Sequence, residues 1–342
     1  HRRLRRGRCS SGLTSVYGPP ISWGTDMASF SGGASLMAGF RLLRQRPGLL
    51  APWALAWLLV GLAPQILPYA VLWPDVVAAY GPMFHDAVAG IEPDQQSAEL
   101  MTLQNRMLPF SLLQLPLSLA GLSILYAAVY RAVLEPKAKG FGYLRLGRAE
   151  LWMMLTQAAA LGLFVLASIA ALIVGAIAVL AIRIASGNDD GVTGIATFGA
   201  CLIAAILLGW CAVRLSLALP MTFTERRFRL LESWALTRGH GWKIFGVMVG
   251  LVAILLLMEV ALVMVVMIVA VAAGVSGGLT GLEAQLQGLF SHPPAVWLPV
   301  LGPWLAVGTV VYAVMAAALH AITVAPLAEI YRQLAGKPAA EV

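Results

Sequence analysis

The chain has 342 residues, of which 60% are hydrophobic and only 11% carry a charge, and its mean hydropathy is +0.83. Soluble domains carry about a quarter charged residues, so this composition excludes a soluble globular fold and indicates a membrane protein. The formal net charge of +7 comes from Lys and Arg residues that lie between apolar runs. This placement predicts contact with anionic lipid headgroups and no binding of nucleic acid.

The first 26 residues differ from the rest of the chain. They begin at His1, are rich in arginine as far as Arg8, and precede the first methionine, Met27. We expect residues 1–26 to be a non-native or disordered leader and residues 27–342 to form a single six-helix transmembrane domain. The alternative is a targeting leader, although the segment lacks the apolar core of a signal peptide.

Six apolar runs are long enough to cross a bilayer, because about 20 helical residues cover a hydrocarbon core of roughly 30 Å. The runs lie at about 49–73, 108–131, 153–182, 194–219, 244–274 and 297–326. The sequence therefore predicts an all-α polytopic membrane protein with six transmembrane helices. Prolines such as Pro68 and Pro116 are compatible with this prediction, because neighbouring groups in membrane proteins satisfy the carbonyls that a proline frees.

The distribution of Lys and Arg predicts the orientation of the spans. From Met27 onward, sixteen of these residues lie on one side, and only Arg106 and Arg183 lie on the other. Basic residues concentrate in cytoplasmic loops, so both termini are expected in the cytoplasm. In the first connection on the opposite side, residues 94–103 are predicted to form a short helix on the outer membrane surface, because its first turn is acidic.

A short motif precedes spans one, three and five. It consists of an aromatic residue, a large apolar residue two positions later and an arginine after two more. The three copies are Phe40-x-Leu42-x-Arg44, Phe141-x-Tyr143-x-Arg145 and Trp234-x-Leu236-x-Arg238. This pattern indicates three repeated hairpins with cytoplasmic interfacial helices. Chance is the alternative, because the tetrapeptide that begins at Phe40 recurs at Phe228 in a different register.

The third copy lies in residues 227–238, which are predicted to form an amphipathic helix on the cytoplasmic surface of the bilayer. One arc of this helix is apolar and the other is polar. The apolar arc holds Phe228, Leu230, Leu231, Trp234 and Ala235, and the polar arc holds Arg229, Glu232, Ser233 and Thr237. Such a helix buries its apolar arc at the boundary of the headgroups. The alternative is a loop helix packed on other cytoplasmic connections.

Two polar residues within the apolar runs are candidates for an intramembrane site. Glu259 lies near the middle of the fifth run, where a charge costs at least about 2.5 kcal/mol. It is either a proton or substrate site or a carboxyl group that links helices. His320, in the sixth run, is a candidate partner of Glu259 or a hydrogen-bond donor between helices. No metal site or cofactor is expected, because no second His or Cys lies at ligand spacing.

A second candidate site is a cytoplasmic interfacial motif that consists of Arg214, Glu232, Trp234, Arg238 and Trp242. Arg214 and Glu329 lie near the cytoplasmic ends of spans four and six, where long charged side chains reach the headgroups. Tryptophans near span ends, such as Trp53 and Trp242, are expected to anchor the protein in the membrane interface.

The segment from Arg214 to Phe245 carries three short motifs. They read Arg-Leu-Ser-Leu-Ala-Leu-Pro, Glu-Arg-Arg and Glu-Ser-Trp-Ala-Leu-Thr-Arg-Gly-His-Gly-Trp-Lys-Ile-Phe-Gly. Together with the stretches that begin at Gly39 and Ile330, they resemble the bacterial glycerophosphoryl diester phosphodiesterase membrane-domain family. The resemblance implies a module of the bacterial inner membrane, which in some members precedes a soluble phosphodiesterase domain. Only ten residues follow Arg332, so we expect the membrane module without that domain.

The sequence contains no P-loop, dinucleotide fingerprint, HExxH motif or nucleophile elbow. We therefore expect a non-enzymatic inner-membrane module that organises partners, either membrane lipids or other membrane proteins. The alternatives are a small transporter or channel that uses the region of Glu259, and a membrane-embedded lipid enzyme, for which Glu259 and His320 alone are too few. The oligomeric state does not follow from the sequence.

Overall fold

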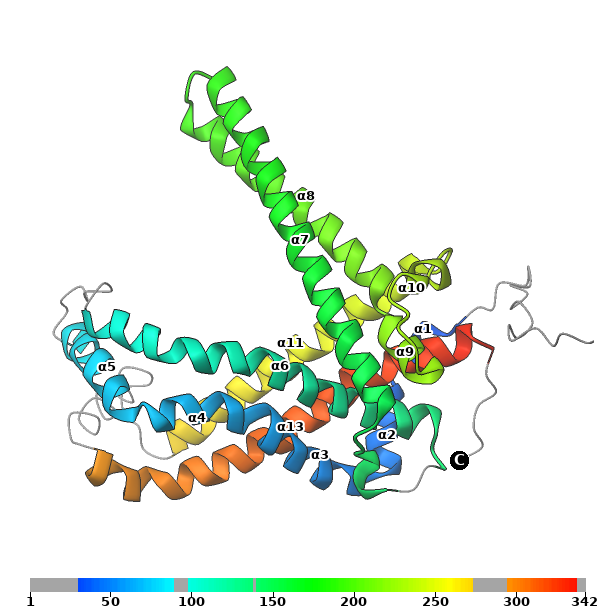
Figure 1. The fold of residues 1–342 in the computed structure, drawn as a ribbon, viewed down its shortest axis with the longest axis horizontal. Coiled ribbons are helices and arrows are strands. Elements are labelled where there is room, and N and C mark those ends of the chain that lie inside the picture. The colour runs from blue at the N-terminus through cyan, green and yellow to red at the C-terminus, as the bar shows by residue number, and fades with distance from the viewer. Residues whose placement is uncertain (1–29, 89–97, 138–139, 273–293, 337–342) are drawn as a thin grey trace, which may run out of the picture.

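The computed structural model describes residues 30–88, 98–137, 140–272 and 294–336 (Figure 1). Every regular element in these ranges is a helix, and six helical segments are long and apolar enough to cross a membrane. These segments are Pro47–Val71, Ala98–Leu134, Phe141–Ala185, Asp190–Glu225, Gly241–Met264 and Leu305–Leu334. They overlap the six apolar runs in order and confirm the predicted all-α polytopic fold. The predicted leader, residues 1–26, lies outside the described residues.

Residues 30–88 consist of short helices that precede, build and follow the first span. They are α1 (Gly32–Leu36), α2 (Ala38–Gln45), a 3₁₀ turn (Pro47–Leu49), α3 (Leu50–Ala56), a π-helical turn (Trp57–Leu62), α4 (Ala63–Val71) and α5 (Trp73–Val88). The π-helical turn lies directly before Pro64. Since proline has no backbone N–H and its ring collides with the carbonyl four residues earlier, the chain widens at this point.

The remaining elements include five long helices. These elements are α6 (Ala98–Leu134), a 3₁₀ turn (Phe141–Tyr143), α7 (Arg148–Ala185), α8 (Asp190–Leu215), α9 (Ala218–Glu225), α10 (Glu232–Leu236), α11 (Gly241–Ala272) and α13 (Pro294–Leu334). Pro109 and Pro116 lie inside α6 without ending it. Residues 98–103 form the first turns of α6, so the prediction of a separate surface helix there was wrong, and residues 94–97 lie outside the described residues.

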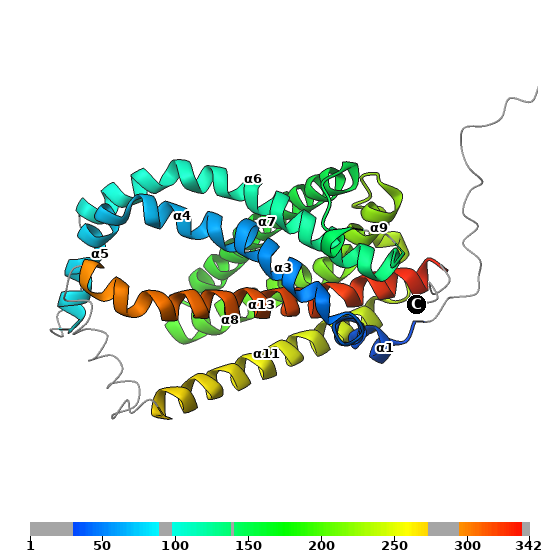
Figure 2. The same ribbon diagram turned by 90° about the horizontal axis from the view of Figure 1, so that it is seen from below.

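The spans are arranged as a bundle with one projecting hairpin. In both views α4, α6 and α13 run in similar directions (Figures 1 and 2). The α7–α8 hairpin leaves the bundle at a steep angle in Figure 1, and α11 diverges from α13 in Figure 2. Helices α1, α2, α9 and α10, residues 135–137 and 140–147, and the last turns of α13 gather at one end, here called the basic end. The first and last described residues both lie there, as six spans require.

The buried core is concentrated at the basic end. Helix α13 packs there against α2, α3 and α6 through a row of alanines, which are Ala313, Ala317, Ala321, Ala325 and Ala328. Small residues let membrane helices approach closely. Gly39 of α2 meets the backbone of α13, because a Cβ atom added at Gly39 would lie only 2.4 Å from the Cα of Ile322. Close backbone contact therefore fixes α2 on α13.

The prediction of one amphipathic helix over residues 227–238 was wrong. Helix α9 ends at Arg226, which adopts a left-handed conformation with φ of 53°, and α10 begins only at Glu232. Leu231 is 69% exposed, as the predicted lipid-facing arc requires, but Ser233 and Thr237 of the predicted polar arc are buried in the protein. The hydroxyl of Ser233 donates to the carbonyl of Arg214 at 2.8 Å, which satisfies an acceptor near the end of α8.

The three copies of the repeated motif share a pattern of burial. Their central residues, Leu42, Tyr143 and Leu236, are buried, and their arginines are exposed. The copies differ in conformation, because the first lies in α2, the second in a 3₁₀ turn and the third in and just after α10. The repeat of three hairpins stays a prediction, supported by this common burial.

Candidate functional site

The two intramembrane candidates are not brought together. Glu259 lies on an exposed face of α11, and the main neighbours of that helix are α1 and α8. His320 is buried on α13 with its ring edge-on to Tyr126 at 4.8 Å and to Trp57 at 5.9 Å between centroids. The predicted pairing of Glu259 with His320 was therefore wrong, because the bundle packs His320 against α6 and the π-helical turn.

The surroundings of His320 contain several buried polar atoms. Within the described part of the chain, Nε2 of His320, Nε1 of Trp57 and the hydroxyl of Tyr130 are buried without a hydrogen-bond partner. Buried polar groups of this kind are normally satisfied, often by an ordered water molecule. No group of three or more metal-ligating side chains occurs among the described residues, and the rings of Tyr126 and Trp57 lie beside His320.

A buried ion pair joins Arg131, near the end of α6, to Glu150, near the start of α7. Arg131 is 6% exposed and Glu150 is 3% exposed. The guanidinium of Arg131 donates to Oε1 of Glu150 and, at 3.0 Å, to the carbonyl of Tyr143. Sequence reasoning missed this pair, because Arg131 was counted only as a topology signal. The signal that identifies it is an acid and a base that flank the same short connection between two spans.

An aromatic surface surrounds Arg214 at the basic end. The guanidinium of Arg214 lies 4.9 Å from the ring centroid of Trp210 and 5.6 Å from that of Trp234. Trp242 packs on Trp210 at 5.4 Å and on Phe245 at 5.9 Å. We call Trp210, Arg214, Trp234, Trp242 and Phe245 the Arg214 surface. Three of the five predicted interfacial residues, Arg214, Trp234 and Trp242, therefore meet.

The other two predicted interfacial residues lie apart from this surface. Glu232 pairs with Arg229 at 3.0 Å, and Arg229 also contacts Glu225 at 2.9 Å. These contacts raise the pKa of Arg229, chiefly through the hydrogen bond to Glu232. Arg238 is exposed beyond the end of α10. The prediction that Glu232 and Arg238 belong to one motif with Arg214 is not supported by their positions.

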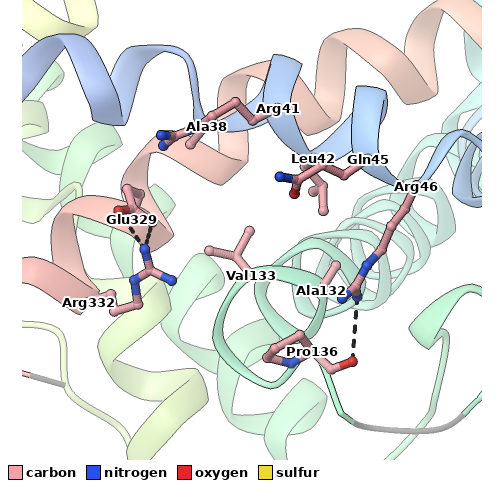
Figure 3. A pocket seen from close by; sticks show the side chains of 10 residues that line it. All are labelled: Ala38, Arg41, Leu42, Gln45, Arg46, Ala132, Val133, Pro136, Glu329 and Arg332. Carbon is pink, nitrogen blue, oxygen red and sulfur yellow. Dashed lines mark hydrogen bonds and ion pairs between the residues drawn. The ribbon is translucent and has the colours of Figure 1, made fainter. Parts of the chain in front are cut away.

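A second polar site is a pocket of about 190 Å³ where α2, the end of α6 and the end of α13 meet (Figure 3). Its lining consists of Ala38, Arg41, Leu42, Gln45, Arg46, Ala132, Val133, Pro136, Glu329 and Arg332. We call it the α2–α13 pocket. Glu329 was expected to extend to the headgroups, but it is buried and pairs with Arg332 at 2.7 Å. Its oxygen also accepts from Gln333 at 2.7 Å.

The tryptophan at position 53 also differs from expectation. It was predicted to anchor the protein in the membrane interface, but it is only 2% exposed. Its Nε1 donates to the carbonyl of Gly142 at 2.7 Å. Gly142 has a positive φ of 58°, and a Cβ there would lie 2.6 Å from Pro52. Trp53 therefore holds the connection between spans two and three against the first span.

In comparisons with protein-family models, curated protein sequences and solved structures, nothing matches this chain. The resemblance to the glycerophosphoryl diester phosphodiesterase membrane-domain family therefore stays a prediction. The fold and the six apolar helices define a multi-span, all-α membrane protein, whose polar and aromatic side chains gather at the basic end.

Proposed function

We propose that the chain is a non-enzymatic module of the bacterial inner membrane that organises lipids at its basic end, with both termini in the cytoplasm. The observation that carries this proposal is the Arg214 surface. Tryptophan and arginine are both stabilised in the headgroup region of a bilayer. The indole ring has an apolar body and a polar N–H group, and the guanidinium binds lipid phosphate. Among the described residues Arg214 has no carboxylate partner, so its charge is available to a lipid.

The apolar residues beside Arg214 support the same proposal. Trp242 is exposed, and so are Trp234, Phe228 and Leu231 on the preceding segment. Apolar side chains at the end of a membrane span are stabilised by contact with the acyl chains that lie just below the headgroups. The inward position of Ser233 and Thr237 has the same explanation, since the outside of the protein at this depth is lipid and the inside contains the carbonyl of Arg214, to which both hydroxyls donate.

The proposed orientation rests on the placement of basic residues. The basic end contains α2, the connections on either side of α10, the connection between α6 and α7 and the end of α13, and most Lys and Arg residues of the described chain lie in these segments, whereas Arg106 and Arg183 lie toward the opposite end. This asymmetry supports a cytoplasmic location for the basic end, because basic residues concentrate in cytoplasmic loops. Cysteine labelling tests it, because an impermeant maleimide should reach Asp190→Cys in intact cells and Arg238→Cys only after the inner membrane is opened. The reverse pattern would show an inverted protein.

The alternative of a transporter or channel through Glu259 has less support. Such a function needs a water-filled path that reaches the carboxylate. The side chain of Glu259 lies instead on an exposed face of α11 among apolar neighbours, including Leu256 and Val263. The proposed function therefore assigns no transported substrate.

The experiment for the proposed function measures lipid contact directly. Spin-labelled phosphatidylglycerol and phosphatidylcholine are compared in proteoliposomes, and the fraction of each lipid immobilised by the protein is measured. The wild type is expected to immobilise more phosphatidylglycerol. Arg214→Gln should reduce this preference, whereas Arg183→Gln, which removes the same charge at the opposite end, should leave it unchanged. Equal immobilisation of both lipids by the wild type would refute the proposal.

A further inference from the structure

The α2–α13 pocket lies apart from the Arg214 surface and has its own chemistry. Three arginines and one acid line it. Arg41 lies in α2, Arg46 directly follows α2, and Arg332 and the acid, Glu329, lie in α13. Three positive charges and one negative charge leave a net formal charge of +2 in a space of about 190 Å³. The cavity therefore attracts an anion.

The arginines are held in place by contacts that leave their charge uncompensated. Arg41 donates to the carbonyl of Ala34 at 2.7 Å. Arg46 donates to the hydroxyl of Tyr143 and, at 3.5 Å, to the carbonyl of Pro136. These acceptors are neutral, and neither arginine forms an ion pair with a described carboxylate. Fixed guanidinium groups with free donors suit the oxygens of a phosphate.

Apart from Gln45, the rest of the lining is apolar. Ala38 and Leu42 of α2 face Ala132 and Val133 of α6 and the loop that follows it, and the arginines stand around them (Figure 3). The apolar part of the lining does not stabilise a bound inorganic anion. It does stabilise a bound phospholipid, because the glycerol and upper acyl carbons lie directly below the phosphate and are removed from water in the pocket.

We propose that the α2–α13 pocket binds the phosphate of one anionic phospholipid from the cytoplasmic leaflet, which deepens the proposed function and rests on it. Arg41 and Arg46 bind the phosphate oxygens, and Leu42 and Val133 contact the glycerol and the first acyl carbons. Arg332 takes part by exchanging partners. In the structure it pairs with Glu329 at 2.7 Å, and the incoming phosphate replaces that carboxylate.

This arrangement makes Glu329 a competitor of the lipid. Glu329 is buried and also accepts from Gln333 at 2.7 Å, so its side chain is fixed beside the pocket. Removing its charge leaves Arg332 free for the phosphate while an amide keeps a similar shape. Substitutions of Glu329 and of Arg41 are therefore expected to change lipid affinity in opposite directions, which a purely structural role for these residues would not produce.

The experiment titrates the full chain in detergent with dihexanoyl-phosphatidylglycerol and counts bound lipid by native mass spectrometry. The wild type is expected to show one saturable site. Arg41→Gln should weaken it about tenfold, the loss that follows from removing a hydrogen bond to a charged group. Glu329→Gln should strengthen it severalfold. Arg44→Gln is the matched control, because Arg44 lies on the same helix and does not line the pocket.

Two further measurements distinguish a phospholipid from free phosphate, and the α2–α13 pocket from the Arg214 surface. Millimolar inorganic phosphate should not displace the bound lipid, and displacement would overturn the assignment to a phospholipid. Arg214→Gln should leave the saturable site intact, so a failure of the proposed function at the Arg214 surface is distinguishable from a failure of the pocket. Equal affinity of the wild type, Arg41→Gln and Glu329→Gln, each shown to be folded by thermal unfolding, would overturn the inference.

Discussion

Gly39→Ala adds one methyl group at a point where α2 and α13 touch through their backbones. The new Cβ would lie 2.4 Å from the Cα of Ile322 and 2.7 Å from the carbonyl oxygen of Ala321. Ordinary contacts between carbon atoms lie at about 3.5–4.0 Å. Because backbone atoms of a helix cannot rotate away, α2 has to move from α13 by about 1 Å to relieve the overlap.

The expected loss of stability follows from that displacement. Overpacking a close-packed core costs about 1–3 kcal/mol of stability. Here the added Cβ meets backbone atoms of α13, which cannot move aside as a side chain could, so we expect a loss of about 3 kcal/mol. The measurement is unfolding in mixed micelles of dodecyl maltoside and increasing SDS, followed by tryptophan fluorescence. Gly246→Ala in α11 is the matched control, since nothing lies within 4 Å of its added Cβ. Equal stability of the two variants would refute the close contact.

Three further substitutions have distinct expected outcomes. Glu150→Gln leaves the guanidinium of Arg131 buried without its counter-charge and should cost about 3–5 kcal/mol in the same unfolding assay. Trp53→Phe removes the donor to the carbonyl of Gly142 and should cost about 1–3 kcal/mol, measured by the same fluorescence change. Glu259→Gln removes a charge from a lipid-facing position, so membrane yield should stay equal or rise, and a clear loss of yield would indicate a partner for this carboxylate.

The positions of the spans could be predicted from the sequence, because a bilayer imposes a minimum length of apolar helix. All six runs coincide with helices that are long and apolar enough to cross a membrane. The Arg214 surface was predicted in part, since Trp234 and Trp242 lie in a short stretch with obvious interfacial composition. Trp210 was missed, because its place inside an apolar run hides it until α8 and α11 are packed together.

The packing at the basic end could not be predicted by helical periodicity. That method places polar residues outward, whereas Ser233 and Thr237 point inward to the carbonyl of Arg214. Sequence reasoning also considered each charged residue separately. It therefore placed Glu329 at the headgroups because of its position near the end of span six, although this carboxylate is buried beside Arg332. In both cases the outside at the end of a membrane span is lipid, and the polar side chain finds its hydrogen-bond partner inside the protein.

The projecting hairpin has a mechanical consequence. None of the residues in the most apolar windows of its two spans is buried, and its buried residues on α7 are confined to the first turns, at Ala149, Glu150, Met153 and Thr156. Beyond Thr156, α7 extends for another 29 residues, or about 44 Å. A rotation of one degree at the anchored turns therefore moves the tip by roughly 0.8 Å. The hairpin therefore has the geometry of a lever, in which a small rotation at the turn that contains Glu150 becomes a much larger displacement at the tip.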